Sequence, residues 1–145
     1  MKNFFYSDFK YKDYSFHYKG TIQKDSIVNY DGKSVAGVAK FTANLGIDLA
    51  TQPGVYANMT YFYKDGFPIT SDNLNYTSSY SLLNAKLGYR GTLSRHFDLD
   101  AFFGVNNIAG TKYPINVFIN QLPDAYMVGP VNTNWYGGIT LNYNF

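Results

Sequence analysis

Residues 39–49 read Ala-Lys-Phe-Thr-Ala-Asn-Leu-Gly-Ile-Asp-Leu. Every odd-numbered position in this stretch is apolar, and the even-numbered positions carry Lys, Thr, Asn, Gly and Asp. Successive side chains of a β-strand point to opposite faces, so this period of two predicts one apolar face and one polar face. The stretch is also longer than the five or six residues that are most common in soluble strands.

The same alternation returns in four later segments, 55–64, 83–90, 97–106 and 135–145. Their odd-numbered positions are apolar except for Gly137, and their even-numbered positions are mostly polar. The aromatic exceptions on the polar face are Tyr56, Phe62, Phe102 and Tyr136. A sixth strand is expected around Lys2–Tyr14. Its pattern is irregular, because one face would carry Phe5, Phe9 and Tyr11 together with Ser7 and Asp13.

The composition agrees with an all-β chain. It contains no Glu, but 15 Tyr, 12 Phe and 13 Gly, which favours strands and turns over helices. The expected fold is an antiparallel meander of about six long strands with almost no helix. A length of 145 residues suits one domain.

The connections between the expected strands alternate in length. Short turns at 51–54 and 91–96 have the size of hairpin loops. The other connections are long, at about 15–34, 65–80 and 107–134. Short turns at one end of a sheet and long loops at the other are typical of outer-membrane barrels, and strands of ten or eleven residues match a tilted bilayer crossing.

Charge and cysteine content exclude several function classes. Charged residues make up 15% of the chain, against roughly 25% in an ordinary soluble domain. A net charge of +2 gives no strong field, so no nucleic-acid partner is expected. The absence of cysteine excludes disulfides and thiol chemistry. No apolar run approaches the ~18 residues of a membrane helix, and the first residues lack the apolar core of a signal peptide.

If the sheet is a membrane wall, its apolar face meets lipid and its aromatic residues mark the borders of the bilayer. The residues expected to face lipid are Phe41, Leu45, Ile47, Met59, Leu83, Leu87, Leu99, Phe103 and Ile139. The expected interfacial aromatics are Tyr61, Tyr63, Tyr89, Phe97 and Trp135, and Tyr80, Tyr113, Tyr136, Tyr143 and Phe145 also lie near expected strand ends. The alternative is a soluble antiparallel β-sheet, a binding or structural domain whose apolar face is its core.

Two later segments resemble the C-terminal strands of TonB-dependent outer-membrane receptors. Residues 81–90 read Ser-Leu-Leu-Asn-Ala-Lys-Leu-Gly-Tyr-Arg, similar to a strand typical of that family. In the following strand Asn106-Asn107-Ile108 and Lys112-Tyr113 match the family pattern, whereas Ala109-Gly110 replaces its usual Phe-Asp. The resemblance is good over 80–145 and weaker over 1–79.

The end of the chain resembles the signal that the outer-membrane assembly machinery recognises. Its residues are Gly138, Leu141, Tyr143 and Phe145. An amphipathic edge strand that ends in an aromatic residue can be docked by strand pairing before a barrel closes. The resemblance therefore predicts a location in the bacterial outer membrane.

The resemblance implies that residues 1–145 are the C-terminal portion of a receptor barrel, without plug domain or signal peptide. Such receptors have 22 strands and a plug, and they import an iron chelate, haem, cobalamin or a glycan. Because a single-chain barrel needs at least eight strands, this chain is expected to be a fragment. The expected partners are the lipid bilayer and the rest of the barrel and plug, or other copies of the chain that share one barrel. The TonB system would act only through the missing plug.

The residues suggest no enzyme. His96, Asp98 and Asp100 share one face of a strand, but the two carboxylates are expected to be solvated or paired with Lys86 and Arg90 on the adjacent strand. No catalytic group, metal site or cofactor is predicted. Ligand-binding residues are not identified, although only the loops 65–80 and 107–134 are expected to supply ligand contacts.

Overall fold

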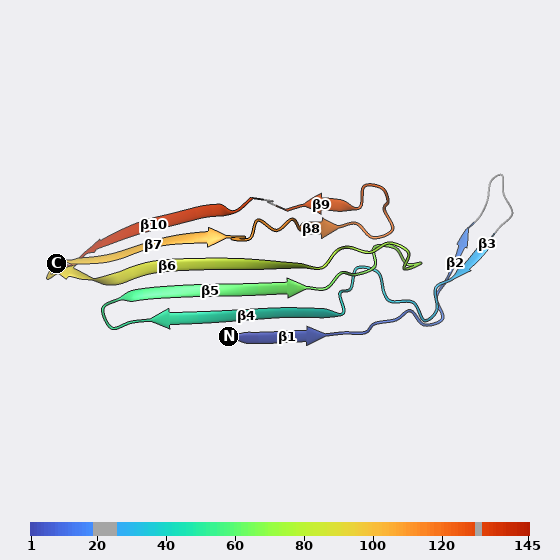
Figure 1. The fold of residues 1–145 in the computed structure, drawn as a ribbon, viewed down its shortest axis with the longest axis horizontal. Helices are drawn as coiled ribbons and strands as arrows, with labels where there is room; N and C mark the ends of the chain where they lie inside the picture. Colours follow the sequence, from blue (N-terminus) through green and yellow to red (C-terminus); the bar gives the residue numbers. More distant parts are fainter. Residues whose placement is uncertain (19–25, 130–131) are drawn as a thin grey trace.

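The structure is a computed structural model that describes residues 1–18, 26–129 and 132–145. Its main element is a six-stranded antiparallel sheet with the strand order β1-β4-β5-β6-β7-β10 (Figure 1). The strands are β1 (Lys2–Tyr6), β4 (Phe41–Ala50), β5 (Val55–Lys64), β6 (Tyr80–Ser94), β7 (Phe97–Asn106) and β10 (Asn134–Tyr143). The described residues include no helix, so the predicted all-β meander is confirmed. No helix in these residues is long and apolar enough to cross a membrane.

The largest differences from the predicted strand bounds lie in β6 and β1, whereas β4 and β10 shift from the predicted 39–49 and 135–145 by one or two residues at each end. The strand predicted at 83–90 extends over Tyr80–Ser94, so its turn to β7 shortens from 91–96 to Arg95 and His96. The strand predicted at Lys2–Tyr14 ends at Tyr6. Its pairing with β4 places Phe4 and Tyr6 on the apolar face and Phe5 on the polar face.

Interactions after Tyr6 tie the chain to the beginning of β4. Ser7 N donates to Lys40 O at 2.9 Å, and Ser7 Oγ donates to Ala39 O at 3.2 Å. Asp8 forms an ion pair with Lys40, with 3.0 Å between Oδ1 and Nζ. The hydrogen bond from Lys40 holds the pKa of Asp8 below its ordinary value. The irregular residues of the predicted first strand therefore leave the ladder and begin the long connection.

Two short hairpins lie within the long connections and were not predicted. One pairs β2 (Ser15–Tyr18) with β3 (Ser26–Asn29), and the other pairs β8 (Pro114–Val117) with β9 (Tyr126–Val128). Strands of three or four residues show too few alternations for a sequence pattern to identify them. Both hairpins lie at the same end of the sheet (Figure 1).

The two ends of the sheet have different connections. The turns 51–54 and 95–96 lie at one end together with the C-terminus, which we call the short-turn end (Figure 1). The described parts of the connections 7–40, 65–79 and 107–133 lie at the other, which we call the long-loop end. This division confirms the layout that the sequence predicts.

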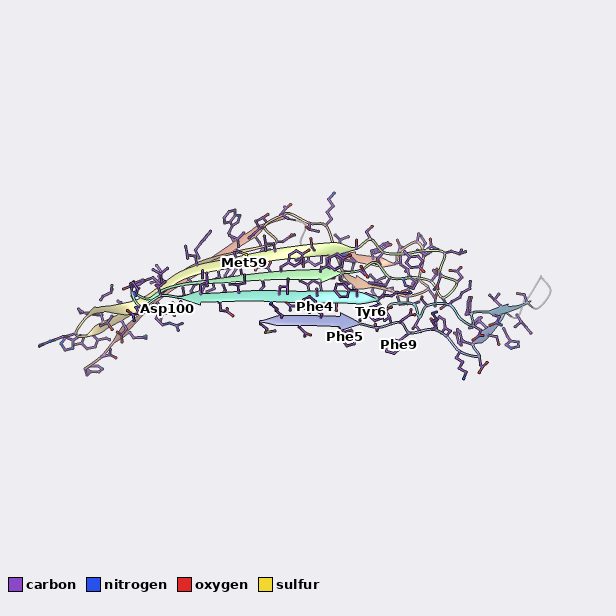
Figure 2. The ribbon with its side chains drawn as sticks, turned by 60° about the horizontal axis from the view of Figure 1, so that its bottom comes forward. Phe4, Phe5, Tyr6, Phe9, Met59 and Asp100 are labelled. Carbon is purple, nitrogen blue, oxygen red and sulfur yellow. The ribbon has the colours of Figure 1, made fainter. Side chains whose placement is uncertain are left out.

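The sheet is a single curved layer (Figure 2). The well-buried apolar residues are Tyr30, Ala39, Ala43, Phe67, Ile69 and Ala125, and of these only Ala43 belongs to the sheet. On the apolar face Leu87 is 59% exposed and Ile139 is 79% exposed. A soluble sandwich would bury these side chains against a second sheet, and the described residues contain no such layer. The outer edges of β1 and β10 also pair with no other described strand, so the sheet does not close into a barrel.

Candidate functional site

All nine residues predicted to face lipid lie on one face of the sheet. The strand register shows this directly, because it places Leu45 beside Tyr61, Tyr61 beside Leu83, and Leu87 beside Phe103. Ile139 joins the same face through Ala101. The register thus unites these residues across five strands, while their contact with lipid stays a prediction.

The predicted interfacial aromatics lie on this apolar face, towards both ends. Tyr61, Tyr63 and Trp135 lie towards the long-loop end, and Tyr89 and Phe97 lie towards the short-turn end. Two further aromatics near strand ends do not share this face. Tyr80 pairs with Lys64, and Tyr136 pairs with Gly104, so both belong to the polar face. These two tyrosines therefore do not belong to a lipid-facing girdle.

The residues that resemble an assembly signal divide between the faces. Leu141 and Tyr143 lie on the apolar face beside Leu99 and Phe97, and Gly138 lies on the polar face beside Phe102. Phe145 follows the strand, and its ring centroid lies 5.0 Å from that of Tyr143. Recognition of these residues by an assembly machinery stays a prediction.

The polar face carries a network around Asp100. Arg90 Nε and Nη2 donate to Asp100 Oδ2 at 2.8 and 2.6 Å, and Tyr56 Oη donates to Asp100 Oδ1 at 3.0 Å. Of the two expected alternatives for Asp100, solvation or pairing with Lys86 and Arg90, the structure shows pairing with Arg90. The network joins β5, β6 and β7, and hydrogen bonds to a charged group are stronger than those between neutral groups.

Lys86 contacts aromatic rings and has no ion pair among the described residues. Its Nζ lies 4.1 Å from the ring centroid of Phe102 and 5.5 Å from that of Tyr56. A cation over an aromatic face is attracted by the negative charge of that face. The polar face therefore combines charged and aromatic side chains in one cluster.

Asp98 is held by neutral side chains. Its carboxylate accepts hydrogen bonds from Thr92 Oγ1 at 2.7 Å and from Asn144 Nδ2 at 2.8 Å. His96 Nδ1 lies 3.0 Å from Asn144 O. Of the expected alternatives for Asp98, solvation or pairing with Lys86 or Arg90, the described residues show no such ion pair, and the bond from Asn144 joins Asp98 to the end of the chain. No group of three His, Asp or Glu side chains among the described residues could hold a metal ion.

Three rings on the polar face cover glycines of the neighbouring strand. A Cβ atom built on Gly88 would lie 2.3 Å from Tyr56 Cζ, and one built on Gly104 would lie 2.2 Å from Tyr136 Cζ. At Gly138 the nearest ring atom of Phe102 would be 2.9 Å away. These distances are shorter than a carbon–carbon contact, so the rings take the space that a side chain would need. Three of the four aromatic exceptions in the alternating pattern thus pack against glycines, and the fourth, Phe62, pairs with Asn44 and Leu82.

We predict that Gly104→Val destabilises the folded sheet by about 1–3 kcal/mol, because the new side chain displaces the ring of Tyr136. The matched control is Gly46→Val on the polar face of β4, where a Cβ atom would meet nothing closer than 3.7 Å. Denaturant unfolding measures both free energies. Adding Tyr136→Ala should reduce the cost of the valine at 104 by removing the clash. Equal losses for both glycine variants would contradict this account.

The connections at the long-loop end are joined by hydrogen bonds. Asn73 Nδ2 donates to Ser34 O, and Ser34 N donates to Asn73 Oδ1 at 2.7 Å. Gly37 N donates to Pro68 O at 2.8 Å, and Asn120 N donates to Ile69 O at 2.9 Å. Ile69 is 1% exposed, so these loops have a small core of their own. We call this group of contacts between 7–40, 65–79 and 107–133 the loop cluster.

A cleft of about 400 Å³ opens in the loop cluster. Tyr14, Phe16 and Tyr30 line one part of it, and Thr70, Ser71, Asp72, Asn120 and Leu122 line the rest. Loops 65–80 and 107–134 were expected to supply ligand contacts, and both contribute here. The aromatic part comes from 7–40, a segment that was not predicted to contact a ligand. These residues became neighbours only through the contacts between loops.

The arrangement is suited to binding. The cleft combines aromatic rings with hydroxyl, amide and carboxylate groups, which is the usual composition of a small-molecule site. A soluble β-sheet domain would expose one apolar patch at most, but this sheet exposes apolar side chains along its full length. A single-layer amphipathic sheet with a loop cluster at one end defines the wall of a membrane barrel.

Comparison with known families agrees with this assignment. The family model "TonB dependent receptor-like, beta-barrel" matches residues 3–108, which run from Asn3 in β1 past the end of β7 at Asn106. The chain belongs to this family of receptor barrels. A search of curated proteins found no match.

Proposed function

We propose that this chain forms part of the wall and outer mouth of a bacterial outer-membrane receptor that imports a scarce nutrient. The observation that carries this proposal is the family match over residues 3–108. Energy for import would pass from the TonB system through a plug domain inside the complete barrel. The nutrient would be an iron chelate, haem, cobalamin or a glycan.

The open edges of the sheet support a barrel completed by further strands. Unpaired backbone N–H and C=O groups cannot face lipid. At the β1 edge, Phe4, Phe5 and Tyr6 are 57%, 61% and 71% exposed, on both faces of the strand (Figure 2). Neighbouring strands would cover these rings and pair with the edge. They would come from the remainder of the receptor or from other copies of the chain.

The two ends of the sheet support an orientation in the membrane. Outer-membrane barrels have short turns on the periplasmic side and long loops outside. The turns 51–54 and 95–96 would then face the periplasm, and the loop cluster would face the medium. A nutrient would meet the cleft between the loops first.

Two measurements test the proposal. Trp135, the only tryptophan, is 66% exposed on the apolar face, so lipids brominated near the headgroup should quench its fluorescence more than lipids brominated at the chain ends. In cells, the protein should fractionate with the outer membrane, and nutrient uptake through it should stop when TonB is deleted. An unquenched tryptophan in a protein of the soluble fraction would contradict the wall assignment. Uptake that continues without TonB would contradict the import mechanism.

A further inference from the structure

A buried serine lies where the long connections of the loop cluster meet. We number these connections in chain order as the first, second and third: 7–40, 65–79 and 107–133. Ser71, in the second connection, is 6% exposed. Its N–H donates to Asn120 Oδ1 at 2.8 Å, and its Oγ accepts from Asn120 Nδ2 at 3.0 Å. The same Oγ lies 3.2 Å from Tyr11 Oη, so Ser71 joins the first and the third connections through one side chain.

Tyr11 carries this contact into the first connection. Its Oη accepts a hydrogen bond from Ala36 N at 3.2 Å, and its ring stacks on that of Tyr14 with 4.9 Å between the centroids. Tyr11 N donates to Lys33 O at 2.8 Å. Because its hydroxyl, its ring and its backbone each have a partner, Tyr11 is fixed in position beside Ser71.

Asn120 carries the contact into the third connection. Besides its two bonds with Ser71, its backbone N donates to Ile69 O at 2.9 Å. All hydrogen bonds that Asn120 forms with other described residues therefore go to the second connection. The first connection is reached directly only by an apolar contact at the next residue, where a Cβ atom built on Gly37 would lie 3.2 Å from Ile119 Cδ1 among the described atoms.

The two residues that follow Ser71 also hold the first connection. Lys33 Nζ donates to Asp72 O at 2.8 Å. Asn73 exchanges two hydrogen bonds with the backbone of Ser34, at 2.7 and 2.8 Å. A displacement of Ser71 would therefore move three consecutive residues that bond to the first connection.

The second connection has a packed interior of its own. Phe67 is 5% exposed and Ile69 is 1% exposed. Phe67 N donates to Thr77 Oγ1 at 3.0 Å, and Ile69 N donates to Asn75 O at 2.8 Å. Closely packed protein has low compressibility and transmits strain. A displacement at one side of this connection should therefore reach its other side.

We propose that Ser71 couples the three long connections into one cooperative unit, so that a displacement of the third connection is transmitted to the first. The coupling runs from Asn120 through Ser71 to Tyr11 and its neighbours, along a continuous network of hydrogen bonds. A molecule that moved one connection would then change the conformation of all three. This inference goes beyond the proposed function, which places the connections at the outer mouth without relating their movements.

Hydrogen–deuterium exchange of the intact protein in detergent tests the coupling. Asn120→Ala removes both side-chain bonds to Ser71, and the amide of Ala36 in the first connection should then exchange about tenfold faster. Tyr11→Phe keeps the stacked ring and removes only the hydroxyl. Because coupling is reciprocal, this variant should speed exchange at the amide of Asn120 by a similar factor. The matched control is Ser78→Ala, an exposed serine of the second connection, which should leave both amides unchanged.

Exchange in β5 and β6 is the internal reference, because a variant that keeps these strands protected has kept its sheet. If Asn120→Ala loses this protection, Tyr11→Phe decides the question alone. Faster exchange confined to the substituted connection and the second one would show that the first and third are independent, and the coupling would be wrong. An equal effect of Ser78→Ala would also overturn it. Neither result bears on import, whereas a location outside the outer membrane would contradict the proposed function and leave the coupling standing.

Discussion

Met59→Arg should destabilise the protein in lipid vesicles by about 2–4 kcal/mol, the cost of an arginine on the lipid face near the bilayer midplane. Met59 lies midway along β5, on the apolar face beside Ile47 and Ala85, and is 49% exposed (Figure 2). The guanidinium would have to reach an interface or remain unsolvated in hydrocarbon. Guanidinium unfolding in vesicles measures the loss.

The adjacent Thr60 provides the matched control. It lies at the same depth but on the polar face, beside Gly46 and Asn84. Thr60→Arg should change the free energy of unfolding by no more than about 0.5 kcal/mol, as for an exposed polar site. Arginine at these two neighbouring positions, which lie on opposite faces of the sheet, should therefore lower the free energy of unfolding by amounts that differ several-fold.

A third variant separates a lipid face from an ordinary protein core. Tyr63 lies on the same face as Met59 but at the long-loop end of β5. The cost of arginine falls to about 0–1 kcal/mol near the membrane interface, so Tyr63→Arg should cost far less than Met59→Arg. Equal costs at 59 and 63, or equal costs at 59 and 60, would contradict a bilayer on this face.

The long strands were predictable because each repeats its alternation several times. β5 and β7 have the bounds that the sequence indicates, 55–64 and 97–106. A strand with one face in an apolar medium requires this period of two. A shift of the strand register by one residue would move every apolar side chain to the polar face. β1 lacked this constraint. Its end at Tyr6 depends on contacts of Ser7 and Asp8 with residues more than thirty positions away, which no local pattern contains.

The candidate sites likewise include some contacts that the sequence predicts and others that only the tertiary structure shows. Residue type and expected neighbouring strands made pairing with Arg90 one of two alternatives for Asp100, and the structure shows this pairing. The role of Tyr56 was visible only as an exception on the polar face, and the register was needed to bring it over Gly88. The cleft could not be predicted, because Phe16, Asp72 and Asn120 come from three loops that meet through tertiary hydrogen bonds.

Gly54→Ala should be the most damaging small substitution in the sheet, with an expected loss of about 3–5 kcal/mol from backbone strain and steric overlap together. Gly54 ends the turn 51–54 with a φ of +96°, a conformation that disfavours residues with a Cβ atom. That atom would lie 2.0 Å from the backbone oxygen of Arg90. The overlap is with backbone, so no side-chain rotation can relieve it.

Relief of the overlap would require the turn to move away from β6. Gly54 O accepts a hydrogen bond from Arg90 N at 2.8 Å, and this contact would then be lost. The β4–β5 hairpin would separate from β6 at the position where Arg90 reaches Asp100. We therefore expect the variant to disturb the polar network as well as the turn, and denaturant unfolding of the folded protein measures the total.

Gly32→Ala separates the two causes. Gly32 also has a positive φ, +76°, but nothing lies within 4 Å of a Cβ atom built there. This variant should lower the free energy of unfolding by only about 1–2 kcal/mol, because backbone strain is its only cause. The difference between the two variants then measures the packing of the turn 51–54 against β6. If Gly54→Ala lowered the free energy of unfolding no more than Gly32→Ala, the turn 51–54 could not pack against the backbone of Arg90 as the structure shows. The hydrogen bond from Arg90 N to Gly54 O would then be weaker than its length indicates.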